Sequence, residues 1–170
     1  MTANYKIDSA SEIRKFLWDQ LIEYNIFDQD DYYSDNLGMS IEAILPVQQQ
    51  PELNQFFSGK KHIIYDKIGM TYNDNWLICD EQISFCIYAT EIDDINEIRN
   101  FMIDTFRRMD EAARDVNQSS RLSNKIKFHS IYIADISPIS PSEELKGFLS
   151  ADVILDVQYS RITDGLGRFL

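Results

Sequence analysis

A periodic row of apolar residues between Glu91 and Val116 constrains the fold of this chain more than any other feature of its sequence. Apolar side chains recur there every three or four residues, which is the spacing of one face of an α-helix. The row consists of Ile92, Ile95, Ile98, Met102, Phe106, Met109, Ala113 and Val116. The pattern predicts one long helix over residues 91–116 whose apolar face packs on a core.

Several stretches around this helix are rich in the β-branched and aromatic residues typical of strands. Residues 62–68 and 76–89 are separated by turn-forming residues, so we expect them to pair as an antiparallel hairpin. Shorter or later candidates are 41–45 and 125–136. Residues 151–162 predict a strand with one buried face and one wet face. The apolar side is Val153, Leu155, Val157 and Tyr159, and the polar side is Asp152, Asp156, Gln158 and Ser160.

The N-terminal region has its own pattern. Ser9 and Glu12 have the spacing of a capping box, and apolar residues follow at helical intervals, so a helix is expected over residues 10–25. Residues 27–39 contain no lysine or arginine and are expected to form an exposed acidic loop. Its aspartates are Asp28, Asp30, Asp31 and Asp35.

This order of elements predicts an α+β fold: a mainly antiparallel β-sheet with the long helix and the N-terminal helix packed on it. The chain has 170 residues, of which 44% are hydrophobic, and this is enough apolar material for one sizeable core. We expect a single domain over 1–170. Within it, 1–40 form the N-terminal helix and acidic loop, 41–162 the α/β core and 163–170 a C-terminal tail.

The charge balance narrows the classes of partner. Sixteen lysines and arginines against 28 aspartates and glutamates give a formal net charge of −12. A nucleic-acid binder neutralises phosphates with clustered basic residues, so we expect no tight binding of DNA or RNA. No apolar run is long enough for a membrane span, and no signal peptide is recognisable, so folding in the cytosol is expected. Cys79 and Cys86 are then expected to be free thiols.

The sequence holds no recognisable catalytic or metal-binding motif. His62 and His129 lie far apart, and neither has a neighbouring ligand at metal-binding spacing. The chain has no Gly-x-Ser-x-Gly elbow and no glycine-rich phosphate loop. We therefore expect no enzymatic activity, no metal and no cofactor.

Aromatic residues in short connecting segments point instead to contacts with other proteins. Aromatic side chains are enriched in protein interfaces, where they bury large areas. The interface candidates are Phe56, Phe57, Tyr72, Tyr32 and Tyr33. The alternative is that these side chains pack beneath the loops of the chain itself, and the sequence leaves both possibilities open.

Three stretches, together with the order of the elements, carry a resemblance to a known family. The first is Leu-Pro-Val-Gln-Gln-Gln-Pro-Glu at 45–52, leading into Ile-Ile-Tyr-Asp at 63–66. The second is Ile-Ser-Phe-Cys-Ile-Tyr at 83–88, running into the long helix through Phe101 and Met102. The third is Phe-His-Ser-Ile-Tyr at 128–132, followed by the strand at 153–159. Over roughly 41–162, the chain resembles the tail terminator and tail-completion proteins of tailed bacteriophages.

The resemblance implies a structural virion protein of the neck, made in the host cytoplasm, with no catalytic activity and no cofactor. Such a protein caps the tail tube and joins it to the head connector as a ring, commonly a hexamer. The implied partners are further copies of the chain, the tail tube protein and the head-connector or neck proteins, with the tail sheath as a further candidate. Genomic DNA passes through the ring.

In such a ring, Asp152 and Asp156 are candidates for the channel wall, where negative charge keeps DNA mobile. Equally, this wet face of the last strand can meet solvent outside the ring. Two alternatives to a terminator remain open: another neck or head-completion protein, and a monomeric module that presents an acidic surface to a basic partner.

Overall fold

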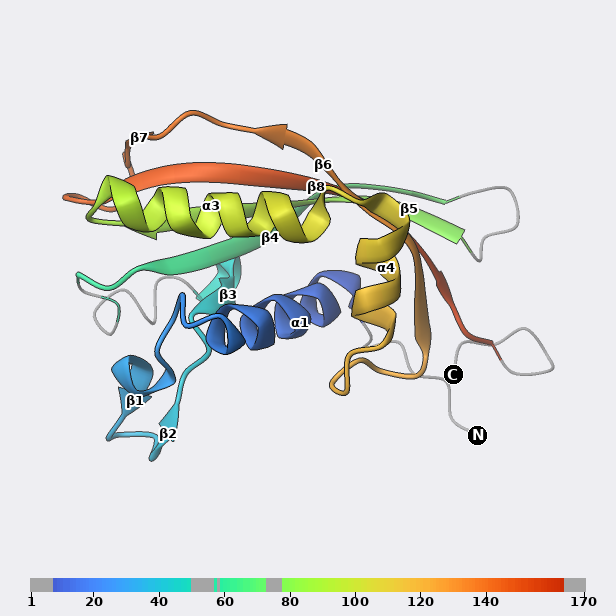
Figure 1. Ribbon diagram of the computed structural model, residues 1–170, viewed down its shortest axis with the longest axis horizontal. Coiled ribbons are helices and arrows are strands. Elements are labelled where there is room, and N and C mark those ends of the chain that lie inside the picture. The colour runs from blue at the N-terminus through green and yellow to red at the C-terminus, as the bar shows by residue number, and fades with distance from the viewer. Residues whose placement is uncertain (1–7, 50–56, 58, 73–77, 164–170) are drawn as a thin grey trace.

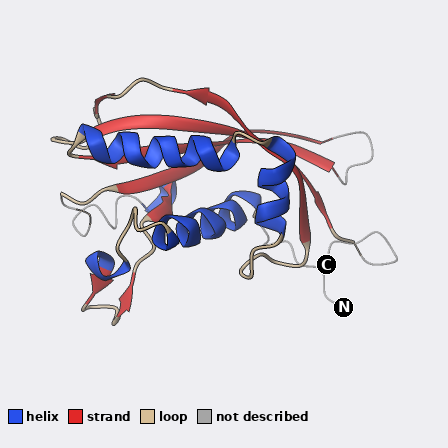
Figure 2. Ribbon diagram, in the orientation of Figure 1, coloured by secondary structure: helices blue, strands red, loops and turns tan. Residues whose placement is uncertain are grey.

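The computed structural model describes residues 8–49, 57, 59–72 and 78–163. Three α-helices in this part of the chain lie on one face of a six-stranded, mainly antiparallel sheet, which confirms the predicted α+β fold (Figures 1 and 2). The strands of the sheet are β3 (Ile44–Pro46), β4 (His62–Tyr72), β5 (Ile78–Ala89), β6 (Ile126–Ile136), β7 (Ser140–Pro141) and β8 (Leu149–Arg161).

The strand order is β3-β4-β5-β8-β6, and the short β7 also pairs with β8. β4 and β5 form the expected antiparallel hairpin, and β8 pairs with β5 from Ile78↔Ser160 to Ala89↔Leu149. β3 runs parallel to β4, which makes the sheet mixed. The two central strands, β5 and β8, therefore have neighbours on both sides and form the rigid middle of the sheet.

Helix α1 (Ser9–Glu23) confirms the predicted N-terminal helix but not its cap. The side chain of Asp8 accepts a hydrogen bond from the Ser11 backbone N–H at 3.1 Å, so Asp8 is the N-cap. Glu12 instead accepts a hydrogen bond from the backbone N–H of Ser123 at 3.0 Å. The capping-box interpretation was wrong because both of its side chains are used in tertiary contacts: Ser9 Oγ donates to the carboxylate of Glu81.

The predicted long helix is two helices, α3 (Ile92–Phe106) and α4 (Met109–Asn117). The helix breaks at Arg108, whose backbone is extended, and α4 then runs at a steep angle to α3 (Figure 1). An unbroken helix of this length would be about 39 Å long. The break lets α3 cover β5 and β8 while α4 turns onto β6. Met109, beside the break, and Ile92, at the start of α3, are both exposed, contrary to prediction. No helix in the described part of the chain is long and apolar enough to cross a lipid bilayer.

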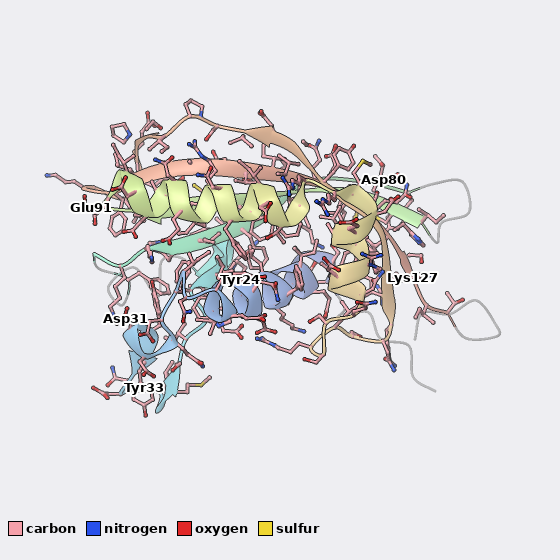
Figure 3. All side chains as sticks on the ribbon, viewed as in Figure 1. Tyr24, Asp31, Tyr33, Asp80, Glu91 and Lys127 are labelled. Carbon is pink, nitrogen blue, oxygen red and sulfur yellow. The ribbon has the colours of Figure 1, made fainter. Side chains whose placement is uncertain are left out.

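The predicted exposed loop at 27–39 is only partly a loop. It contains a 3-10 helix, η1 (Gln29–Tyr32), and a two-stranded hairpin formed by β1 (Tyr33–Ser34) and β2 (Met39–Ser40). Gly38 closes the hairpin with a φ of +64°, a conformation that favours glycine. The hairpin projects away from the sheet, and Tyr33 and Asp31 mark its position in Figure 3. The aspartates of this region are exposed, as expected, but Phe27 and Tyr32 are buried.

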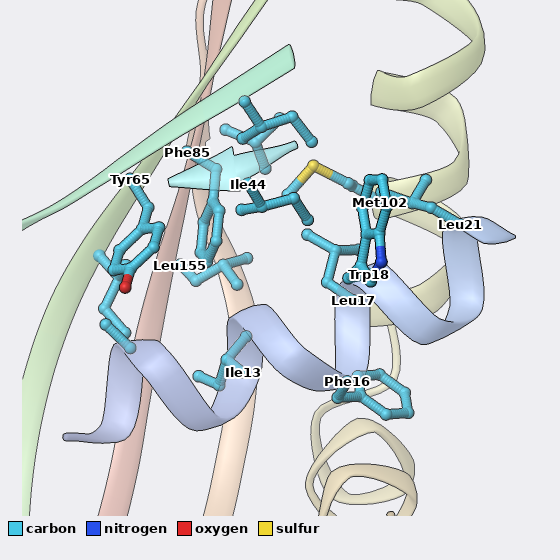
Figure 4. Close-up of a cluster of buried hydrophobic side chains, with 14 of the residues drawn as sticks. Ile13, Phe16, Leu17, Trp18, Leu21, Ile44, Tyr65, Phe85, Met102 and Leu155 are labelled. Carbon is cyan, nitrogen blue, oxygen red and sulfur yellow. The ribbon is translucent and has the colours of Figure 1, made fainter. Parts of the chain in front are cut away.

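One cluster of buried side chains joins the helices to the sheet. Figure 4 shows Ile13 and Leu17 of α1 facing Phe85 of β5 and Leu155 of β8, with Met102 of α3 beside them. All five side chains are fully buried. Full burial of a side chain of this size stabilises the fold by roughly 1.5–3 kcal/mol. The helices are thus fixed to one face of the sheet.

Candidate functional site

The other face of the sheet carries no helix in the described part of the chain. Strand alternation sorts the side chains: in β8, positions 151, 153, 155, 157 and 159 are buried under the helices. The positions between them, including Asp152 and Asp156, are half-buried on the opposite side. The sequence prediction of one buried and one wet face for this strand is therefore confirmed. We call the second side the helix-free face.

The helix-free face is acidic. Cross-strand pairing places Asp66 opposite Ser84, Asp80 opposite Gln158, Asp152 opposite Cys86 and Asp156 opposite Gln82, so all four aspartates share this side. Among the described strand residues that share it, Lys127 is the one lysine or arginine. Negative charge on this face is therefore opposed by little positive charge.

One end of the helix-free face contains a hollow of about 440 Å³ over β5, β8 and β6. Gln158 Nε2 donates a hydrogen bond to Asp80 Oδ1 at 2.9 Å on its wall. Tyr132 lies opposite Asp156, and its hydrogen bond to that carboxylate raises the pKa of the Tyr132 phenol. Among the described residues, none donates a hydrogen bond to the buried Asp156 Oδ1. The hollow therefore has a polar, hydrogen-bonded floor.

The middle of the face forms a second hollow of about 380 Å³, which residues 140–144 border from the side. Asp152 and Cys86 lie on its floor. Burial raises the pKa of the Cys86 thiol to about 12, so the thiol stays protonated at neutral pH and is a poor nucleophile. Tyr88 OH donates to Glu144 Oε2 at 3.0 Å and ties the bordering segment to the sheet.

The far end of the face is closed by an aromatic stack. The His62 ring lies between Phe57, at a centroid distance of 4.8 Å, and Tyr88, at 5.2 Å. His62 Nδ1 lies 2.9 Å from the carbonyl oxygen of Lys60. Burial lowers the pKa of His62, which keeps the ring neutral at physiological pH. This histidine is a packing residue.

The structure divides the predicted interface residues. Tyr33 is exposed on β1, and Tyr72 is exposed, although it ends β4 and does not belong to a connecting segment. Tyr32 and Phe57 are buried, which is the alternative that the sequence left open for these aromatic residues. Tyr32 is turned inward by η1, where its OH donates to the Lys61 carbonyl at 2.5 Å, and Phe57 is buried against His62. Phe56 lies outside the described residues.

The sequence placed Asp152, Asp156 and Gln158 on one wet face of β8 but did not reveal their neighbours from other strands, Asp80 and Tyr132. Alternation alone puts Gln158 on the side of Asp156. Placing Asp80 and Tyr132 beside Asp156 requires the strand order, in which β8 lies between β5 and β6. No short-range pattern in the sequence signals that order.

The arrangement is suited to surface contact more than to chemistry. In the part of the chain that the structure describes, no group of three or more His, Cys, Asp or Glu side chains is placed to hold a metal ion. The carboxylates are spread along strands, and the nearest thiol is protonated. What the helix-free face offers is a rigid, acidic, polar surface.

Comparison with protein-family models gives no match, and no curated protein matches the sequence. The residues and their arrangement are therefore the basis for a functional assignment.

Proposed function

We propose that the protein is a structural subunit of a bacteriophage neck. In this role, copies of the chain form a ring that caps the tail tube and joins it to the head connector, and DNA passes through the ring. The ring subunit has no catalytic role and needs no cofactor. The proposal rests on two grounds: the resemblance over residues 41–162 and the acidic character of the helix-free face.

The observation that carries the proposal is the acidic helix-free face. Asp152 and Asp156 lie four residues apart on β8, which corresponds to about 13 Å along the strand. Their neighbours Asp66 and Asp80 extend the negative charge across three strands. A channel wall for DNA works by weak repulsion of phosphates, because clustered lysine and arginine side chains would bind the phosphates and hold the genome in place. A rigid acidic surface fits this requirement.

The position of the face in the sheet supports the same role. β5 and β8 pair along twelve residues, and helices anchor their other side through a fully buried core. A surface built on central strands holds its charges in fixed positions better than a surface built on loops does. Charges lining a conduit need such fixed positions.

Electron microscopy of virions that lack this gene product tests the proposal, with particles complemented by the intact gene as the control. We expect tail tubes of abnormal length, or tails that are not attached to filled heads. Abnormal length indicates a terminator, whereas tubes of normal length beside unattached heads indicate a neighbouring neck or head-completion protein. Normal, infectious particles would refute both roles.

A second candidate function is a monomeric module that binds a basic protein. The groove between α1, α3 and α4, of about 870 Å³, favours it. Arg107 and Arg108 line the groove, but acids outnumber them: Asp19, Glu23, Asp104, Glu111 and Asp115. Light scattering of the purified chain separates the candidates, because the module stays monomeric at every concentration.

A further inference from the structure

The groove between α1, α3 and α4 has an aromatic end, formed by Tyr24 and Phe101. Tyr24 caps α1, and its ring centroid lies 5.4 Å from that of Phe101 on α3. Both residues line the groove, and Figure 3 shows Tyr24 between the two helices. Tyr24 is 63% exposed, whereas Phe101 is half-buried. The aromatic end therefore presents two adjoining rings to a partner.

The end of α1 holds Tyr24 in a fixed position. Asn25 follows it with a φ of +56°, in the left-handed region, and the helix ends there. The backbone N–H groups of Ile26 and Phe27 then donate to the Leu21 carbonyl at 2.9 and 3.2 Å. Ile26 and Phe27 are buried. The chain thus turns inward directly after Tyr24 and leaves that ring at the surface.

Negative charge adjoins the two rings. Glu23 precedes Tyr24 and lines the same groove, where Gln20 Nε2 donates to Glu23 Oε2 at 3.2 Å. In the part of the chain that the structure describes, no lysine or arginine forms an ion pair with Glu23. The last turn of α1 contains no basic residue to balance the partial negative charge of the helix C-terminus. Each feature favours a positively charged group at the aromatic end.

The two arginines that line the groove are paired with other carboxylates. Arg107 Nη2 lies 3.0 Å from Asp104 Oδ1, three residues earlier in the chain. Arg108 Nη1 lies 2.9 Å from Glu111 Oε2, three residues later. Neither guanidinium supplies the missing charge beside Glu23.

Lysines lie over two other aromatic rings of the described chain. Lys61 Nζ is 5.3 Å from the ring centroid of Phe27, and Lys60 Nζ is 5.7 Å from that of Tyr32. A cation within about 6 Å of a ring face is attracted by the negative charge of the π-system. Among the described residues, none places a cation over Tyr24 in this way. The ring of Tyr24 is therefore open to a cation from another molecule.

We propose that the aromatic end of the groove binds an arginine side chain, presented by a basic segment of a partner protein. The planar guanidinium stacks on the ring of Tyr24 and pairs with the Glu23 carboxylate, while its methylene groups contact Phe101. Arginine fits better than lysine because its charged group is planar and less strongly hydrated. The inference deepens the second candidate function, on which it rests for the nature of the partner.

An NMR titration of the isotope-labelled full chain tests the proposal, with the peptide acetyl-Gly-Leu-Arg-Leu-Gly-amide as the probe. Salt at about 0.15 M screens attraction to the rest of the acidic surface. We expect chemical-shift changes that concentrate at the end of α1 and around Phe101 on α3. A peptide with lysine in place of arginine should bind at least about twofold more weakly. A peptide with citrulline, which has nearly the same shape but no charge, should bind still more weakly.

Variants of the chain locate the contact. Tyr24→Ser and Glu23→Gln should each weaken binding about threefold or more, whereas Tyr24→Phe keeps the ring and should bind nearly as well as the unaltered chain. Tyr33→Ser and Asp35→Asn are the matched controls, because they alter an exposed tyrosine and an exposed carboxylate elsewhere, and binding should not change. Thermal melts check that every variant folds.

Several results would overturn the arginine site. They are a peptide that causes no shifts at millimolar concentration, shifts spread over the whole acidic surface, equal binding of the arginine peptide and either replacement, and unchanged binding by Tyr24→Ser. The second candidate function fails separately: light scattering would show that the unaltered chain associates with itself, even if the peptide binds at the aromatic end.

Discussion

The two faces of the central strands carry opposite kinds of side chain, buried apolar ones and solvent-facing polar ones, although they share one backbone. On the covered face, β5 contributes Ile83, Phe85 and Ile87, all fully buried beneath the helices. On the helix-free face, the intervening residues are polar or half-buried, among them Asp80 and Ser84. Because strand side chains alternate, one strand can stabilise the fold with one side and present charge with the other.

Two adjacent carboxylates show the difference most clearly. Glu81 is buried on the covered face, where it accepts hydrogen bonds from Tyr159 OH at 2.8 Å and from Ser9 Oγ, with Lys67 Nζ at 3.5 Å. Asp80, the residue before it, is half-buried on the helix-free face and accepts from the Gln158 amide. The same functional group thus fixes α1 to the sheet at one position and contributes to an open acidic surface at the next.

The largest expected effect is on the covered face. Phe106 is fully buried at the end of α3, and its ring meets that of Phe16 edge to face at 6.5 Å. Phe106→Ala should lower the free energy of unfolding by about 3–5 kcal/mol, because it removes a large buried ring. Arg108→Ala, at the exposed helix break, is the control and should change it little. Urea unfolding measures both, and equal losses would mean that α3 presents a different face to the core.

A smaller effect should separate the adjacent carboxylates. Glu81→Ala leaves the buried Tyr159 hydroxyl without its acceptor and should cost about 1–3 kcal/mol. Asp80→Ala should stay within about 0.5 kcal/mol, since its neighbourhood is open to water. Chemical denaturation of the two variants checks the difference. If Asp80→Ala proved the more destabilising, the contrast between the faces would break down.

The smallest effect is a dependence of stability on pH that comes from His62. Burial holds the pKa of His62 below 6.5 in the folded chain, so the unfolded chain takes up the proton first as the pH falls below that value. Protonation of His62 in the unfolded chain should therefore lower the free energy of unfolding as the pH falls below 6.5, by at most about 1.4 kcal/mol per pH unit. Above pH 6.5 this effect should vanish.

The control for this titration is His62→Phe, which keeps an aromatic ring in the stack but cannot bind a proton. Unfolding by urea at pH 7.5 and at pH 5.5 should show a smaller loss of stability in the variant than in the unaltered chain. Identical losses would show that His62 does not titrate in this range.

Local patterns predicted most of the elements, and tertiary contacts account for the errors. The alternation in β8 gave its two faces correctly, because nothing interrupts that strand. The row of apolar residues at 91–116 gave the helical period but not the break at Arg108, which serves to bring α4 onto β6. Ser9 and Glu12 matched a capping box because the motif is local, whereas their actual partners, Glu81 and Ser123, are distant in sequence.

The candidate site was predictable only in part for the same reason. Asp152 and Asp156 follow from one strand, but the acidic surface needs β4, β5 and β8 side by side. Tyr32 lies among exposed aspartates in the sequence and resembled a surface residue. Its burial depends on η1 and on the distant Lys61 carbonyl, which no local pattern reveals.

The most direct test of the central claim is the rate of genome ejection from assembled virions that carry Asp152→Lys with Asp156→Lys. The matched control is Asp104→Lys with Asp115→Lys, the same change of charge at exposed positions of α3 and α4 on the covered side of the sheet. Because the helix-free face should meet the passing DNA, its variant should assemble normally and eject DNA more slowly than the control. Unchanged ejection, or equal slowing by both variants, would contradict a channel-facing role for this face.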